Sequence, residues 1–242
     1  QQTIEMCRYC FMCRHANSTF LVTKLDHVNG KDAERDLRQS LKLLRTDHVD
    51  LLLLHGVGLG DGWDDLDRIL APDGVLTYLR QAKRDGLTRF IGLSTHPPYG
   101  VAMKLLDRAD DLEVAMPFLN ALSVVKEGTA FPARCRAMGM GLAAMKVLGG
   151  DGQLATDDAR ALRYAWSIPG VACALVGATQ PEHVRRIGRF ASVLAVSVAV
   201  FGAMLWLLYA QEMLHLAGGG EFGPGHVDLL FVKLAAGLLL VA

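Results

Sequence analysis

Short apolar segments alternate with amphipathic ones along residues 20–190. The predicted strands are Phe20–Leu25, Val49–His55, Arg89–Thr95, Glu113–Phe118, Gly141–Val147 and Ala172–Gly177. They are nearly all apolar and bounded by Gly, Asp or Pro, which is typical of strands covered on both faces. The predicted helices between and after them are Ala33–Leu44, Gly74–Asp85, Tyr99–Arg108, Gly128–Met138, Thr156–Trp166 and Pro181–Phe190. This alternation predicts an α/β protein of about six βα units, arranged as a doubly wound sheet or an incomplete barrel.

The hydrophobic pattern changes after residue 190. Residues 191–210 carry no charge, and a run of about 20 apolar residues is long enough to span a bilayer. Arg185, Arg186 and Arg189 precede this run, which predicts that the preceding domain lies on the cytoplasmic face of the membrane. A second apolar run, residues 227–242, predicts a helical hairpin. The alternative is that the apolar tail covers an open edge of the barrel.

The chain therefore divides into three predicted regions: a cysteine-rich segment (1–19), the βα domain (20–190) and the apolar tail (191–242). The 25 Lys and Arg residues balance the 25 Asp and Glu residues, which gives a formal net charge of zero. Both signs are mixed along the βα domain. This distribution argues against a nucleic-acid-binding face, and it says nothing about the oligomeric state.

Polar residues end the first two predicted strands. Lys24 closes the segment Phe20-Leu-Val-Thr-Lys24, and His55 ends Val49-Asp-Leu-Leu-Leu-Leu-His55. The carboxyl ends of parallel strands meet at one edge of a sheet, where βα folds keep their active sites. We therefore expect Lys24 and His55 to share a catalytic site.

Three of the five cysteines lie close together near the start of the chain. Cys7, Cys10 and Cys13 are separated by two residues each, a spacing similar to that of a bacterial ferredoxin-type run in which Asn17 stands where the fourth cysteine is due. The spacing is compatible with a three-cysteine iron–sulfur cluster, with a zinc site completed by His15, or with a segment that binds no metal.

Residues 20–188 resemble the aldo-keto reductases, a family of NAD(P)H-dependent oxidoreductases built on a (β/α)8 barrel. Leu21-Val-Thr-Lys24 is similar to the strand that carries the family's catalytic lysine. Thr46-Asp-His-Val-Asp-Leu-Leu-Leu-Leu-His55 is similar to the next strand, which carries the catalytic histidine. The resemblance implies an incomplete TIM (β/α)8-type barrel that lacks the first two βα units.

Further motifs of the resemblance follow in order. Phe90-Ile-Gly-Leu-Ser-Thr95 and Met116-Pro-Phe-Leu-Asn120 match strands whose ends hold the nicotinamide carboxamide. Met145-Lys-Val-Leu-Gly-Gly150 and Val176-Gly-Ala-Thr-Gln-Pro-Glu-His183 match segments near the pyrophosphate and the adenosine. The cofactor-binding residues that the resemblance implies are Ser94, Thr95, Asn120, Lys146, Gly177, Thr179 and Gln180. Because Gln180 stands where many relatives carry a basic residue, both NADP and NAD remain open as the cofactor.

The resemblance implies reduction of a small carbonyl compound to an alcohol. In the family a tyrosine donates the proton, a lysine lowers the pKa of that tyrosine, a histidine orients the carbonyl and an aspartate pairs with the lysine. Lys24 and His55 match two of these roles, and Tyr9, inside the cysteine cluster, is not assigned the donor role. The alternative is a non-catalytic, membrane-anchored barrel remnant that binds a nucleotide or a partner.

Overall fold

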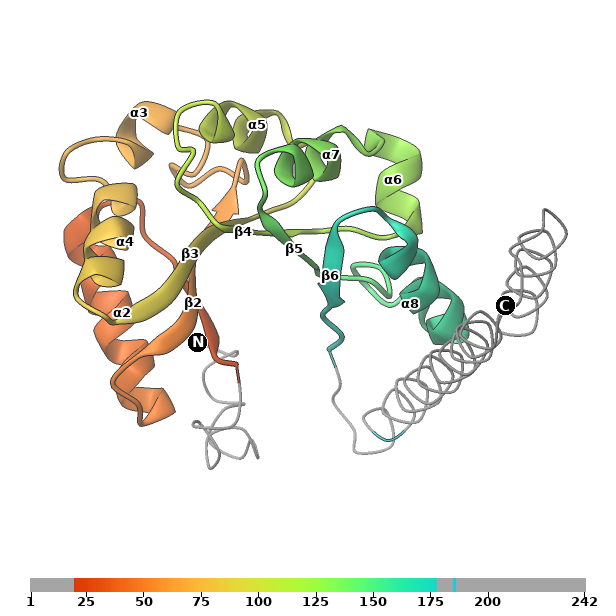
Figure 1. The fold of residues 1–242 in the computed structure, drawn as a ribbon, viewed down its shortest axis with the longest axis horizontal. Coiled ribbons are helices and arrows are strands. Elements are labelled where there is room, and N and C mark those ends of the chain that lie inside the picture. Colours follow the sequence, from red (N-terminus) through yellow and green to blue (C-terminus); the bar gives the residue numbers. More distant parts are fainter. Residues whose placement is uncertain (1–19, 178–184, 186–242) are drawn as a thin grey trace, which may run out of the picture. The chain divides into compact units, whose positions relative to one another are not determined.

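The computed structural model describes residues 20–177 and Arg185 (Figure 1). Their strands form a single six-stranded sheet in which neighbours follow chain order and every pair is parallel. The strands are β1 (Val22–Leu25), β2 (Val49–Val57), β3 (Thr88–Thr95), β4 (Val114–Pro117), β5 (Gly141–Ala144) and β6 (Val171–Ala174). This confirms the predicted α/β fold with six parallel strands. Within the described residues, β1 and β6 are edge strands, each with one neighbour.

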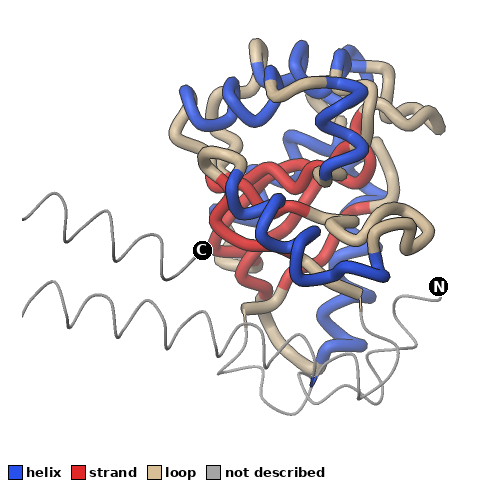
Figure 2. Tube along the Cα trace, turned by 90° about the vertical axis from the view of Figure 1, so that its right-hand side faces the viewer, coloured by secondary structure: helices blue, strands red, loops and turns tan. Residues whose placement is uncertain are grey.

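Helices line the outer side of this sheet. They are α2 (Gly30–Leu44), α3 (Leu66–Ile69), α4 (Val75–Arg84), α5 (Gly100–Leu106), α6 (Ala121–Glu127), α7 (Ala130–Ala137) and α8 (Asp158–Ser167), which a 3-10 turn at Ala155–Asp157 precedes. Figure 2 shows the strands in the middle of the described part with helices around them. The sequence pattern predicted five of these helices and missed α3 and α6, which have 4 and 7 residues.

Helix α2 shows how local sequence sets an element. Asn29 caps its first turn, because the Asn29 side chain accepts a hydrogen bond from the Asp32 backbone N–H at 2.9 Å. Arg45 ends the helix in the left-handed conformation, at φ 56°. Ala33 and Leu37 are fully buried on one face of the helix, and the helix packs against β1 and α4. The helix therefore connects two adjacent parallel strands.

The side chains of the strands alternate between two hydrophobic clusters. Leu52 and Leu54 of β2 belong to the large cluster that includes the buried faces of the helices. Leu51 and Leu53 point the other way and pack in a smaller inner cluster with Met116. His55 is the next residue on this inner side, because side chains alternate along a strand. The inner side of the sheet thus combines an apolar cluster with polar residues at the carboxyl ends of its strands.

Several sequence-based expectations concern residues outside the described part. These are the cysteine-rich segment with Cys7, Cys10 and Cys13, the apolar run 191–210, and the cofactor candidates Thr179 and Gln180. Within residues 20–177, no helix has the length and hydrophobicity needed to cross a membrane. In the same part of the chain, no group of three or more His, Cys, Asp or Glu side chains is arranged to hold a metal ion.

Candidate active site

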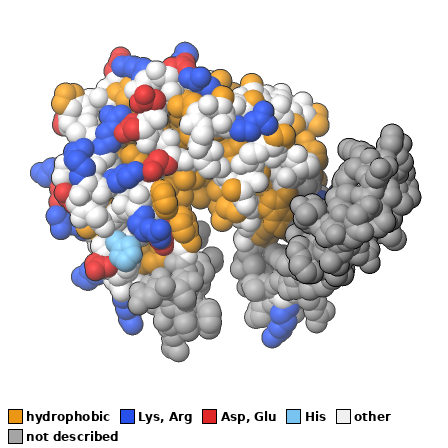
Figure 3. Space-filling model, in the orientation of Figure 1, with side chains coloured by type: hydrophobic (Ala, Val, Ile, Leu, Met, Phe, Trp, Pro, Cys, Tyr) orange, Lys and Arg blue, Asp and Glu red, His pale blue; other side chains and the backbone are white. Residues whose placement is uncertain are grey.

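The polar residues of the candidate site come from the carboxyl ends of four of the six strands. These residues are Lys24 in β1, His55 in β2, His96 after β3 and Lys146 after β5. Although β1 and β5 are not neighbours in the sheet, Lys146 is close enough to Lys24 to affect its titration. The inner cluster also joins Leu51 and Leu53 of β2 to Ala143 of β5, which is not a neighbour of β2, so the sheet is curved around this cluster. Figure 3 shows hydrophobic side chains along the hollowed inner side of the described residues.

Lys24 is the most deeply placed cation of this group. Burial lowers the pKa of its ammonium group, and the nearby positive charge of Lys146 acts in the same direction, whereas Asp26 opposes both. Lys24 stands opposite Leu53 in the β1–β2 register, so its side chain starts from the inner face of the sheet. A partly desolvated ammonium group in this position interacts strongly with any negative charge that develops nearby.

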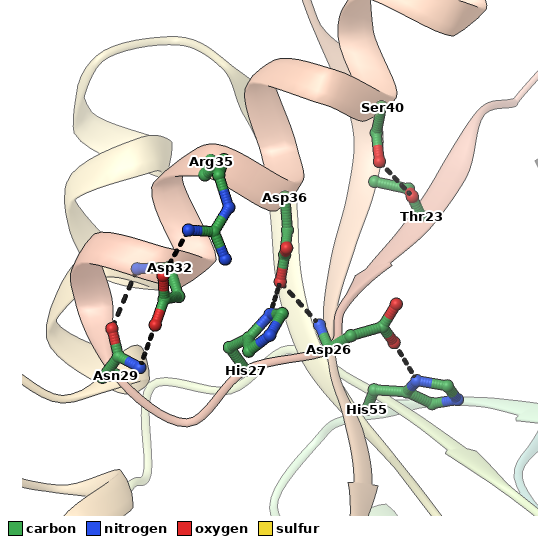
Figure 4. A network of polar contacts seen from close by, with 9 residues as sticks. All are labelled: Thr23, Asp26, His27, Asn29, Asp32, Arg35, Asp36, Ser40 and His55. Atoms are coloured by element: carbon green, nitrogen blue, oxygen red, sulfur yellow. Dashed lines mark hydrogen bonds and ion pairs between the residues drawn. The ribbon is translucent and has the colours of Figure 1, made fainter. Parts of the chain in front are cut away.

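His55 is paired with Asp26, a residue that follows β1. The Nδ1 atom of His55 is hydrogen-bonded to the Asp26 carboxylate (Figure 4). Since an ionised carboxylate can only accept, Nδ1 carries the hydrogen. This hydrogen bond is the main reason why the pKa of Asp26 lies below its ordinary value. The side chains of His55 and Asp26 are 47% and 64% exposed, so the pair is accessible to a bound molecule.

A second carboxylate, Asp36 of α2, holds the segment that carries Asp26. The Asp36 Oδ2 atom accepts a hydrogen bond from the Asp26 backbone N–H at 3.1 Å and another from His27 Nδ1 at 2.8 Å (Figure 4). The Asp36 side chain is only 16% exposed. Helix α2 therefore fixes the position from which the Asp26 carboxylate reaches His55.

His96 lies at the same edge of the sheet and was not singled out from the sequence. Its ring packs edge-on against Phe118, with 5.2 Å between the ring centroids. Burial lowers the pKa of His96, and the charges of Lys146, Lys24 and His55 reinforce this shift. His96 directly follows the strand that ends at Thr95. A search for polar residues at the carboxyl ends of the predicted strands, which identified Lys24, would therefore also have found His96.

The hydroxyl groups of Ser94 and Thr95 are engaged within the sheet. Ser94 Oγ accepts a hydrogen bond from the Gly56 N–H at 3.1 Å and donates to the Leu54 carbonyl at 3.3 Å. The Thr95 hydroxyl donates to the Val57 carbonyl at 2.7 Å. These bonds bridge β3 to the irregular end of β2, next to His55. A contact of either residue with the nicotinamide carboxamide stays a prediction.

Asn120 connects the ends of β4 and β5. It caps α6, where its side chain accepts a hydrogen bond from Ser123 N at 3.0 Å. Its Nδ2 group donates to the Lys146 carbonyl at 2.8 Å. Lys146 has a positive φ of 57°, which begins the glycine-rich loop. Gly177 lies just beyond β6, at the same edge of the sheet. The structure thus brings Asn120 and Lys146 together, and their cofactor roles stay predictions.

The tyrosines of the described part are placed with the helices. Tyr78 and Tyr164 belong to α4 and α8. The Tyr99 hydroxyl donates to the Phe118 carbonyl, and burial raises the pKa of Tyr99 to about 12. A phenol that is buried, bonded and hard to ionise is a poor proton donor to a substrate. Tyr99 therefore does not fit the donor role at Lys24.

Comparison with known proteins places this arrangement in a family. The model of the aldo/keto reductase family matches residues 14–160, which is more than half of the 242 residues. The methylglyoxal reductases DkgB of Salmonella typhi and Salmonella typhimurium are 35% identical over 80 residues, a match that covers 32% of this chain and 27% of each of those proteins. The chain thus matches about a quarter of the length of these curated relatives.

Solved structures show the same fold. An aldo-keto reductase of Pseudomonas aeruginosa superimposes with a TM-score of 0.60 at 25% identity, covering 74% of this chain and 66% of that one. An aldo/keto reductase of Klebsiella pneumoniae, solved with NADP and acetate, gives a TM-score of 0.56 at 20% identity over 74% of this chain and 66% of that one. The described strands therefore correspond to part of a TIM-barrel-like fold, and the chain belongs to the aldo-keto reductase family.

Proposed function

We propose that this chain reduces a carbonyl compound to an alcohol with NADH or NADPH. The observation that carries the proposal is that Lys24 and His55 lie on the inner face at the carboxyl ends of neighbouring strands, with His96 and Lys146 directly after β3 and near the end of β5. Basic groups above an apolar floor suit a reaction in which negative charge develops on an oxygen atom.

The side chains present also suit a nicotinamide dinucleotide. Lys24 and Lys146 supply positive charge toward an anionic ligand, and the loop that begins at Lys146 contains glycines that let a backbone approach closely. At Gly149, φ is +86°, which residues with a Cβ atom rarely adopt, and a Cβ atom there would lie 3.0 Å from the Gln153 backbone nitrogen. This glycine therefore cannot be replaced without reshaping the loop.

When bound, the reduced nicotinamide ring supplies the hydride that adds to the carbonyl carbon. Lys24 stabilises the negative charge that then develops on the carbonyl oxygen, because its ammonium group is partly withdrawn from water. His55 presents a ring nitrogen to the same oxygen and orients the carbonyl. The apolar side chains of the inner cluster, among them Leu53 and Met116, limit the access of water to the site from the interior of the sheet.

The substrate class that we propose is a small 2-oxoaldehyde. The support is the similarity to the methylglyoxal reductases, which covers 80 residues. Larger carbonyl compounds are expected to be poorer substrates.

The test is the oxidation of NADH or NADPH in the presence of methylglyoxal. We expect turnover by the unmodified chain and losses on the order of 100-fold or more in Lys24→Met and His55→Gln, which is the usual contribution of acid–base groups. Lys104→Met and His48→Gln are matched controls, because Lys104 is an exposed residue of α5 and His48 precedes β2 at its opposite end. Equal activity in all five proteins would contradict the proposal, and cofactor binding without turnover would favour a binding role.

A further inference from the structure

His96 differs from the other histidines of the described part in what its ring contacts. The rings of His27, His48 and His55 are each hydrogen-bonded to an aspartate. Within residues 20–177, the ring nitrogens of His96 make no hydrogen bond, and the ring packs edge-on against Phe118. The side chain of His96 is half-buried. Its nitrogens can therefore bond to a molecule that enters the site.

His96 lies on the inner side of the sheet, the side that carries Lys24 and His55. Side chains alternate along a strand, and Phe90, six residues before His96, packs against the inner cluster. Phe118, which contacts the His96 ring, packs against the same cluster. The strand direction and the aromatic contact thus agree in placing the imidazole beside the proposed reaction site.

Phe118 is a fixed support for this ring. Its backbone N–H donates to the Thr95 carbonyl at 2.8 Å, and its own carbonyl accepts from the Tyr99 hydroxyl. A Cβ atom at Gly150 would lie 3.5 Å from the Phe118 ring, so the loop after β5 lies beside the same ring. Packing therefore holds His96 in position, and its nitrogens are not needed for that purpose.

The groups around His96 favour a neutral imidazole. Burial lowers the pKa of His96, and the charges of Lys146, Lys24 and His55 act in the same direction. No carboxylate is among the described groups that shift this pKa. A neutral imidazole has one N–H donor and one acceptor nitrogen. His96 can therefore donate a hydrogen bond to an uncharged oxygen atom without bringing another positive charge into the site.

We propose that His96 recognises the second oxygen atom of a 1,2-dicarbonyl substrate. This inference rests on the proposed carbonyl reduction and names the residue that sets its preference for 2-oxoaldehydes. Strands β2 and β3 are neighbours, and adjacent strands lie about 4.8 Å apart. Side chains at their ends can reach two adjacent oxygens of one small molecule. His55 orients the carbonyl that is reduced, and His96 donates to the other oxygen, which a simple aldehyde lacks.

The kinetic test compares methylglyoxal with propanal, an aldehyde of the same carbon number without the second oxygen. His96→Phe keeps a ring against Phe118 but removes both nitrogens. We expect this variant to lower kcat/KM for methylglyoxal roughly 3- to 10-fold, the effect of one lost hydrogen bond, and to leave propanal nearly unchanged. His96→Asn retains an N–H donor and should recover part of the preference. His48→Phe is the control, because His48 precedes β2 at its opposite end.

Two kinetic outcomes would overturn the inference. Equal losses of kcat/KM for methylglyoxal and propanal in His96→Phe would show that His96 does not distinguish the two aldehydes. A raised KM for the nicotinamide cofactor, with the preference between aldehydes unchanged, would show that His96 contacts the cofactor instead.

A binding measurement separates this inference from the proposed function. Pyruvamide has two adjacent carbonyl oxygens, whereas propionamide has one. With oxidised nicotinamide cofactor present, we expect pyruvamide to shift the ¹⁵N resonances of the His96 ring, and propionamide to leave them nearly unchanged; His48 is the internal control. This shift in a chain that reduces neither aldehyde would contradict the proposed function and support dicarbonyl recognition. No shift with pyruvamide would overturn the role of His96, whatever the turnover.

Discussion

Gly92→Ala tests the contact between β3 and β4, which places His96 and Phe118 beside each other. A Cβ atom at Gly92 would lie 2.0 Å from the Val114 carbonyl oxygen and 2.9 Å from its carbonyl carbon. Both are backbone atoms, so no rotation of a side chain relieves the clash. The two strands must separate by more than an ångström before the methyl group reaches ordinary contact distance.

The expected loss of stability follows from this displacement. Overpacking in a core costs about 1–3 kcal/mol, and weakening one or two of the β3–β4 hydrogen bonds costs roughly 1 kcal/mol each. The affected bonds flank Gly92, among them Glu113 N–H to the Ile91 carbonyl at 2.9 Å. We therefore expect a decrease of about 2–5 kcal/mol in the free energy of unfolding, a large share of the 5–15 kcal/mol that is typical of folded domains.

The assay is urea unfolding followed by far-ultraviolet circular dichroism. Gly141→Ala is the matched control, because a Cβ atom at this strand position would meet its nearest neighbours at 3.8 and 3.9 Å, which is ordinary contact. Gly141→Ala should unfold at nearly the same urea concentration as the unmodified protein. Equal midpoints for Gly92→Ala and Gly141→Ala would refute the claimed close approach of β3 to β4.

Three further predictions concern the site. Lys24→Met should raise the free energy of unfolding by roughly 0.5–2 kcal/mol near neutral pH while it abolishes turnover, because burial disfavours the charged lysine; a less stable variant in thermal unfolding would contradict this. His55→Gln should raise the pKa of Asp26 toward its ordinary value, measured by ¹³C NMR. Because folding lowers this pKa, the contribution of Asp26 to stability is present above the unfolded carboxyl pKa and is lost as pH falls through the folded value. Ser94→Ala should cost about 1–3 kcal/mol in urea unfolding, since it leaves the buried Gly56 N–H without its partner; unchanged stability would argue that water replaces the hydroxyl.

The strands were predictable because they are short apolar runs between turn residues. Which of their side chains face inward was not, because Leu51 to Leu54 are all leucine and apolar on both faces. The helices α3 and α6 were missed because they are too short for a helical period to develop. Asn120 illustrates the same limit, since its capping of α6 became evident only from the backbone around it.

Lys24 and His55 were identified from the sequence because they are polar residues at the ends of predicted strands. The sequence could not show what they contact. The bond between Asp26 and His55 joins residues that are 29 positions apart. It depends on the path of the segment after β1, which Asp36 fixes from a separate helix. The interaction of Lys146 with Lys24 depends on the curvature of the sheet, which a linear pattern does not specify. Both interactions are tertiary, and the structure was needed to find them.

The central claim is that this chain transfers a hydride to a carbonyl carbon at the edge formed by Lys24 and His55. The most direct measurement uses a small aldehyde and a reduced nicotinamide cofactor that carries deuterium at both C4 positions, with mass spectrometry of the alcohol. The account predicts one deuterium on the former carbonyl carbon for the unmodified chain and for Lys104→Met, and a loss of labelled alcohol in Lys24→Met and His55→Gln. Alcohol without deuterium, or equal labelled product from all four proteins, would contradict it.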